Sequence, residues 1–135
     1  MFLQGIHHVA IICSDYERSK RFYTEILQFP IINETYRAER QSYKLDLKVS
    51  ETEQIELFSF ISPLPRPTSP EACGLRHLAF RVKDLDQVVD YLREHGVLCE
   101  PIRMDETTGR RERFTFFRDP DNLPLELYEA RTTDG

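Results

Sequence analysis

The sequence predicts an α+β fold made of two tandem βαβββ modules, and three observations support it. Short segments with the apolar alternation of half-buried strands surround two segments with helical apolar spacing. The order strand, helix and three strands occurs twice. Residues 62–73 hold four of the eight prolines and predict a stiff linker between the halves. We therefore predict one domain over residues 1–135, formed by module 5–61 and module 74–130.

The first module begins with an apolar segment, Ile6–Cys13, which predicts a buried strand. Ser14 and Glu17 match a capping box, in which two side chains satisfy free backbone N–H groups at a helix start. Apolar residues at helical spacing then predict a helix over residues 15–27. Pro30 prevents the helix from continuing. Three strands are expected after it, at residues 30–36, 43–49 and 54–60.

The second module repeats this order, beginning with a strand over residues 75–82. Asp84 and Gln87 resemble a second capping box, and Gly96 is placed to end the helix that follows. Three strands complete the module, and we place them at residues 97–102, 113–117 and 125–128. A polar loop separates the first two, and an Asp-Pro-Asp-Asn turn separates the last two. The polar tail 131–135 is expected to fray.

Composition narrows the functional classes. The chain carries 18 basic and 23 acidic residues, for a net charge of −5, whereas nucleic-acid-binding proteins show a basic face. No apolar run reaches the roughly 18 residues that a membrane helix needs, and no secretory leader is visible. Three widely spaced cysteines predict free thiols in a reducing compartment. We expect a cytoplasmic protein whose partner is a small-molecule substrate, with no nucleic acid and no membrane.

The two halves also align residue by residue. A shift of 69 residues places His8 on His77, and a shift of 70 places Glu56 on Glu126, with one inserted residue between them. The two histidines occupy equivalent positions in the first strands, and the two glutamates occupy equivalent positions in the last strands. Agreement in element order, helix caps and apolar pattern indicates a duplicated module.

These four polar residues are the candidate metal ligands. Taken singly, a strand histidine is more typical of a hydrogen-bonded core group, and a strand glutamate of an exposed or arginine-paired one. A carboxylate between apolar neighbours is nevertheless costly to bury without a partner, and matched positions in both halves favour a shared one. A divalent cation suits two imidazoles and two carboxylates, with water positions left open. The predicted metal site therefore comprises His8, Glu56, His77 and Glu126.

The sequence resembles the vicinal-oxygen-chelate superfamily, which groups glyoxalase I, bleomycin resistance proteins and extradiol dioxygenases. The segments that carry the resemblance are IHHVAI, IELF, GLRHLAF and FRDPDNLPLELYE, and the likeness spans roughly residues 5–129. It is nearest to short bacterial glyoxalase-I-like members. The resemblance implies a curved, sheet-lined cup around one divalent metal, with nickel or cobalt favoured and zinc or manganese possible. The modules of one cup belong to one chain or to the two chains of a homodimer.

The resemblance also implies an activity. The His, Glu, His, Glu ligand pattern of bacterial glyoxalases I falls on the four candidate residues. It implies a lyase that converts the hemithioacetal of methylglyoxal and glutathione into lactoylglutathione by glutamate-mediated proton transfer through an enediolate. Glu126 is the first candidate for the base, and Glu56, its equivalent in the other module, is the second.

One departure from the pattern concerns glutathione. Glutathione-using members carry a basic residue where Ile12 stands in this chain, and the equivalent position of the second half holds Arg81. Arg81 either contacts the substrate or forms an ordinary ion pair. Other superfamily activities therefore stay open: an epimerase, a thiol transferase, a dioxygenase, or a non-catalytic small-molecule-binding or resistance protein.

Overall fold

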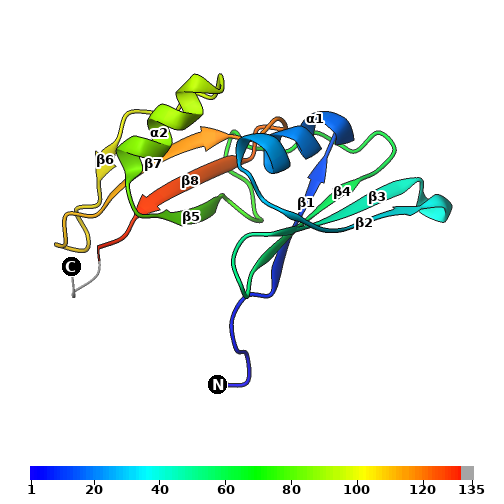
Figure 1. Cartoon of the computed structure of the whole chain (residues 1–135), viewed down its shortest axis with the longest axis horizontal. Helices are drawn as coiled ribbons and strands as arrows, with labels where there is room; N and C mark the ends of the chain where they lie inside the picture. The colour runs from blue at the N-terminus through cyan, green and yellow to red at the C-terminus, as the bar shows by residue number, and fades with distance from the viewer. Residues whose placement is uncertain (132–135) are drawn as a thin grey trace. The chain divides into compact units, whose positions relative to one another are not determined.

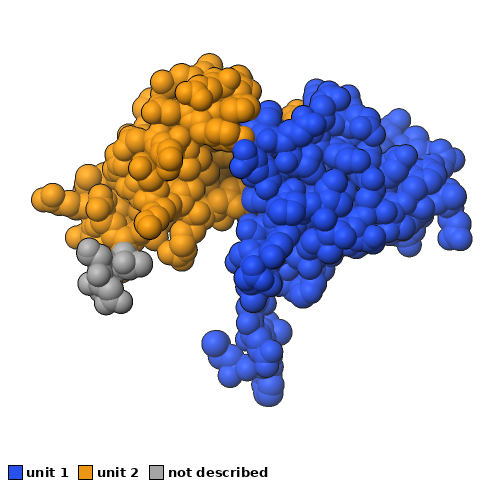
Figure 2. Space-filling view, in the orientation of Figure 1, with its two compact units in different colours: residues 1–65 blue, residues 66–135 orange. Residues whose placement is uncertain are grey.

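The computed structural model describes residues 1–131. The tail predicted to fray falls almost entirely on residues 132–135, outside that range. The chain divides into two compact units, Met1–Pro65 and a second unit that begins at Arg66, and Figure 2 colours them blue and orange. The division falls inside the proline-rich segment 62–73. Each unit contains one four-stranded mixed sheet with a helix on one face (Figure 1).

Unit 1 has the order strand, helix and three strands. Its sheet runs β1-β4-β3-β2, with β1 parallel to β4 and the remaining pairs antiparallel. Alternate residues of the strands point to the helix and form a core that is almost completely buried. The elements are β1 (His8–Cys13), α1 (Tyr16–Arg21), a π-helix (Phe22–Ile26), β2 (Ile31–Arg37), a short 3₁₀ helix (Ala38–Arg40), β3 (Ser42–Lys48) and β4 (Gln54–Ser59).

Three sequence-based expectations for unit 1 need correction. The first strand is buried only at alternate residues: Cys13 is buried, whereas Ile12 is 54% exposed, because one sheet face lies away from the helix. The helix N-cap is Asp15 rather than Ser14, and its carboxylate accepts from the backbone N–H of Arg18 at 3.1 Å. The predicted helix 15–27 is α-helical only in its first part and continues as the π-helix.

Unit 2 repeats the order with β5 (Leu78–Val82), α2 (Leu85–Glu94), β6 (Arg103–Met104), β7 (Arg113–Arg118) and β8 (Pro124–Glu129). Its sheet runs β5-β8-β7-β6, with β5 parallel to β8. Asp84 caps α2 by accepting from the backbone N–H of Gln87, as predicted. Gly96 has φ +80° and lets the Val97 N–H reach back to the Leu92 carbonyl at 2.8 Å, which confirms it as the C-terminal cap.

The predicted strand at residues 97–102 is wrong. That segment is irregular, and the edge strand is the two-residue β6. The backbone N–H of Val97 is used by the helix cap, and Pro101 has no N–H to offer a ladder. One backbone bond, from Glu100 N–H to the Phe116 carbonyl at 2.9 Å, holds the segment against β7.

Both units therefore contain strand, helix and three strands, which confirms the α+β class and the two tandem βαβββ modules. All three cysteines are free thiols, as predicted. No helix within residues 1–131 is long and apolar enough to cross a bilayer.

A buried carboxylate ties the last strand to the helix of unit 2. Glu129, 7% exposed, accepts from the backbone N–H of Leu85 at 2.8 Å, in the first turn of α2. It also accepts from Nε and NH2 of Arg113, at 2.9 and 3.1 Å. The Arg113 guanidinium holds the pKa of Glu129 below its usual range.

Glu129→Gln is expected to lower the free energy of unfolding by about 1–3 kcal/mol at pH 7, because charge-assisted bonds to Arg113 are lost. Since the folded pKa is depressed, this contribution is complete above the unfolded pKa of about 4.3 and disappears as the pH falls through the folded pKa. Urea unfolding between pH 7 and pH 3 checks this, and the two proteins should converge toward acid pH. The exposed Glu94→Gln is the control, and equal stabilities at pH 7 would contradict the prediction.

Candidate metal centre

In unit 1 the structure brings His8 and Glu56 together. The parallel pairing of β1 and β4 sets Ala10 opposite Glu56. His8 is two residues before Ala10 on the same strand, so the side chains of His8 and Glu56 project from the same sheet face. Nδ1 of His8 lies 3.4 Å from Oε2 of Glu56, whose side chain is only 12% exposed. The neighbouring His7 also lies close to this pair: its Nδ1 is 3.0 Å from Nδ1 of His8.

Unit 2 holds the equivalent pair. The parallel pairing of β5 and β8 sets Ala79 opposite Glu126, as Ala10 stands opposite Glu56. Nε2 of His77 lies 3.3 Å from Oε1 of Glu126, whose side chain is 13% exposed. The equivalence inferred from the repeat therefore extends to the register and burial of the two glutamates, whereas the two histidines approach them through different ring nitrogens.

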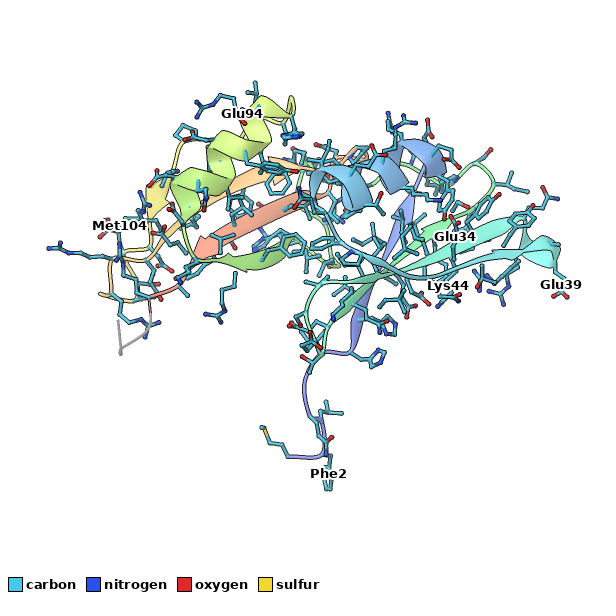
Figure 3. All side chains as sticks on the ribbon, in the orientation of Figure 1. Phe2, Glu34, Glu39, Lys44, Glu94 and Met104 are labelled. Carbon is cyan, nitrogen blue, oxygen red and sulfur yellow. The ribbon has the colours of Figure 1, made fainter. Side chains whose placement is uncertain are left out.

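The two glutamates have different neighbours, and the neighbour of Glu56 is cationic. Nζ of Lys44, on β3, lies 3.7 Å from Oε1 of Glu56 and 2.7 Å from Oδ1 of Asp46. Figure 3 labels Lys44 in unit 1. Asp46 is the residue opposite Glu56 across the β3–β4 ladder. Lys44 therefore offsets part of the negative charge on this side of the pair.

Glu126 has an aromatic cross-strand neighbour, and the charges of Arg76 and Arg103 also act on it. Its partner across the β7–β8 ladder is Phe116, whose ring contacts the His77 ring edge-on at 5.1 Å between centroids. Burial raises the pKa of Glu126 above its usual value, and the nearby His77 opposes this shift. A buried carboxylate with an imidazole beside it is a site that a cation would stabilise.

The donor chemistry fits a divalent ion, but one unit supplies too few ligands. Each unit contributes one imidazole and one carboxylate. Within residues 1–131, no three His, Cys, Asp or Glu side chains gather closely enough to hold an ion. A site with four such ligands would therefore need more than one His–Glu pair.

A comparison with known protein families agrees with the matched His–Glu pairs and the tandem modules. The model of the Glyoxalase/Bleomycin resistance protein/Dioxygenase superfamily matches residues 5–127. The chain belongs to this superfamily. The resemblance seen in the sequence is thereby confirmed for nearly the whole chain.

Similar members of the superfamily span the full chain. The uncharacterized protein YwkD of Bacillus subtilis (strain 168) is 62% identical over 129 residues, which cover 96% of this chain and 99% of YwkD. The uncharacterized protein YaeR of Escherichia coli (strain K12) is 56% identical over 127 residues, covering 94% and 97%. The crystal structure of a glyoxalase family protein from Enterococcus faecalis has a TM-score of 0.88 and 46% identity, covering 96% and 100%.

Two more distant proteins have names that state a chemistry. A 2-epi-5-epi-valiolone epimerase of an Actinomyces species is 28% identical over 143 residues, covering 91% of this chain and 78% of the epimerase. A mutant of the fosfomycin resistance protein FosX from Listeria monocytogenes, complexed with Mn(II) and 1S,2S-dihydroxypropylphosphonic acid, has a TM-score of 0.74. Its identity is 18% over 98% of each chain, so that likeness shows the fold alone.

Arg81, the predicted substrate residue, lies on the same sheet face as the unit 2 pair. It stands opposite Tyr128, two residues along each strand from the Ala79–Glu126 position, and its side chain is exposed. The equivalent residue of β1 is the exposed Ile12. The position of Arg81 suits substrate contact, and its role stays a prediction.

Sequence reasoning missed a group of arginines in unit 2. A cavity of about 310 Å³ beside the His77–Glu126 pair is lined by Arg66, Arg76, Arg103 and Arg118 among others. These residues are scattered along the sequence and follow no strand or helix period. The only signal was the presence of Arg66 in the proline-rich segment and of Arg76 directly before His77.

Proposed function

We propose that this protein is a metal-dependent lyase of the glyoxalase I type, acting on a substrate with two adjacent oxygens. The hemithioacetal of methylglyoxal and glutathione is the best candidate substrate. The proposal rests on one observation above all: each module holds one His–Glu pair, and the two glutamates occupy the same register position with side chains 12% and 13% exposed. Membership of the superfamily supports a reaction of this class.

The proposed ligands of one divalent cation are His8, Glu56, His77 and Glu126. Nickel or cobalt is favoured, and zinc or manganese is possible. The FosX complex with Mn(II) supports a divalent ion, because that protein shares the fold. When bound, the cation would polarise the two substrate oxygens and stabilise the negative charge that develops on them.

The contribution of the chain itself is proton transfer. We assign it to the carboxylate of Glu126, which takes the proton from the hemithioacetal carbon and delivers it to the neighbouring carbon, while the hydroxyl proton of the first carbon passes to the oxygen of the second. The product is the thioester lactoylglutathione, so the reaction is an isomerisation that needs no other reagent. Glu126 is preferred to Glu56 because burial raises the pKa of Glu126, which makes it a stronger base than an exposed carboxylate, whereas Lys44 lies 3.7 Å from Oε1 of Glu56.

Metal content and turnover test this proposal together. Protein purified without chelator should contain about one divalent ion per chain by mass spectrometry, as one four-ligand site for each pair of modules requires. Chelation should abolish hemithioacetal turnover, and nickel or cobalt should restore it. The double variant His8→Ala/Glu126→Ala is the control that should bind no metal. Wild-type protein that neither contains metal nor gains it on soaking would rule out the mechanism.

Epimerisation is the second candidate function, and the similarity to the valiolone epimerase favours it. An epimerase uses the same proton abstraction but returns the proton to the carbon from which it came. Stereochemical inversion of a substrate with adjacent oxygens, without formation of a thioester, would distinguish it. A metal-free chain that binds a small molecule without turnover would instead match the binding and resistance proteins of the superfamily. The homodimer and the cytoplasmic location stay predictions.

A further inference from the structure

The arginine-lined cavity lies wholly within unit 2, so its geometry does not depend on unit 1. Its volume is about 310 Å³, and the segment from Arg66 to Ala72 forms one wall. Residues of β6 and β7 and the start of β8 form the other. The charged side chains in the lining are four arginines and two glutamates: Arg66, Arg76, Arg103, Arg118, Glu71 and Glu100.

Two of these arginines pair with the carboxylates of the lining. Arg76 binds Glu71 through two nitrogens, at 2.9 Å from Nε and 3.3 Å from NH2. Arg103 lies 3.4 Å from Glu100, and its guanidinium also stacks over the Phe114 ring at 5.0 Å. These pairs account for both negative charges of the cavity wall.

The other two arginines rest on neutral oxygens. Arg66 donates to Oγ1 of Thr68 at 3.1 Å and to the backbone carbonyls of Leu75 and Arg76. Arg118 donates to the backbone and side-chain oxygens of Asn122, at 3.4 Å each. The lining therefore has an excess of two positive charges, which makes the cavity attractive to an anion.

The cavity adjoins the His–Glu pair of the same unit. Phe116 lines the cavity, contacts the His77 ring and stands opposite Glu126 in the ladder. Pro124, also in the lining, lies two residues before Glu126 on the same strand. NH1 of Arg76 lies 3.3 Å from Nδ1 of His77. An anion in the cavity would therefore be a close neighbour of the metal ligands proposed for unit 2.

We propose that this cavity binds the oxyanionic group of the substrate, a carboxylate or a phosphoryl group, while the adjacent oxygens of the same molecule reach His77 and Glu126. The placement of the rest of the substrate relies on the proposed function, whereas anion binding does not. Planar guanidinium groups match the paired oxygens of both anions. A glutathione-derived substrate presents carboxylates of this kind.

An NMR titration of chelator-treated protein tests the anion site without relying on the metal. The probes are inorganic phosphate and acetate, added at constant ionic strength. Wild-type protein should show saturable shifts for unit 2 amides around the cavity with at least one probe. Arg118→Gln and Arg66→Gln should each weaken that binding by about 10-fold or more, as expected for a lost charge-assisted hydrogen bond. Arg93→Gln removes one exposed arginine from α2, outside the cavity, and should leave the affinity within about 2-fold.

The outcomes separate the two proposals. Tighter binding of acetate would indicate a carboxylate substrate, and tighter binding of phosphate a phosphoryl one; both support the cavity. No saturable binding by wild-type protein, or equal weakening in Arg93→Gln and Arg118→Gln, would overturn it. Anion binding without metal or turnover would support the anion site and contradict the proposed lyase activity. Metal-dependent turnover without anion binding would support the lyase activity and contradict the anion site.

Discussion

Glu126→Gln is expected to lower kcat by about 10²- to 10⁴-fold, the range for loss of a positioned proton-transfer group. Glutamine keeps the shape of the side chain and one oxygen for the metal but cannot accept a proton at pH 7. Metal binding should therefore weaken without disappearing. The measurement is kcat for the hemithioacetal at saturating substrate and metal, with metal content determined on the same samples.

Glu56→Gln is the matched control, because Glu56 occupies the same register position in unit 1. It should weaken metal binding in a similar way yet retain more turnover once metal is saturating, since the proposal gives Glu56 a role in metal binding and assigns proton transfer to Glu126. Full activity of Glu126→Gln would exclude Glu126 as the base. A larger kcat loss in Glu56→Gln than in Glu126→Gln would reverse the assignment.

Removal of either histidine should eliminate tight metal binding. Loss of a residue that only orients a metal ligand typically lowers metal affinity by about 10- to 100-fold. His8→Ala and His77→Ala each remove a proposed ligand, so each is expected to lower the affinity by more than that. The two residues lie in different units, so an equal effect of both is the signature of one site built from two modules. Competition with a chromogenic chelator measures the affinity.

His95→Ala is the control for this series. His95 ends α2, and its Nδ1 lies 2.9 Å from the Tyr91 carbonyl, so its loss should leave metal affinity unchanged. Retention of full affinity in either His8→Ala or His77→Ala would exclude the shared four-ligand site.

Co-expression of His8→Ala with His77→Ala distinguishes a site within one chain from a site shared across a dimer. If the modules are exchanged between chains, a mixed dimer has one site that lacks both histidines and one intact site. Metal binding would then return in part. If each site lies within one chain, every site lacks a histidine and binding would not return.

Local pattern predicted β1, β4 and β8 to within two residues at each end, but β5 begins at Leu78 rather than at residue 75, so His77 lies just before its strand. The apolar alternation of β4 and β8 places Glu56 and Glu126 on the face opposite the buried core, where the structure has them. It failed at residues 97–102, where a helix cap and a proline use or remove the N–H groups that a strand needs. It also missed Asp15 as the helix cap, because Ser14 and Asp15 are both good N-caps and only the observed start of the helix selects between them.

The residues alone were enough to establish the duplicated module, the family and the four candidate ligands, because equivalent side chains recur at the same place in each half. The folded chain added what no spacing contains. It set Lys44 beside Glu56 and Phe116 beside Glu126, because β3 pairs with β4 and β7 pairs with β8. It also gathered Arg66, Arg76, Arg103 and Arg118 around one cavity. Such contacts depend on how distant strands pair and where irregular segments run, and local periodicity does not encode either.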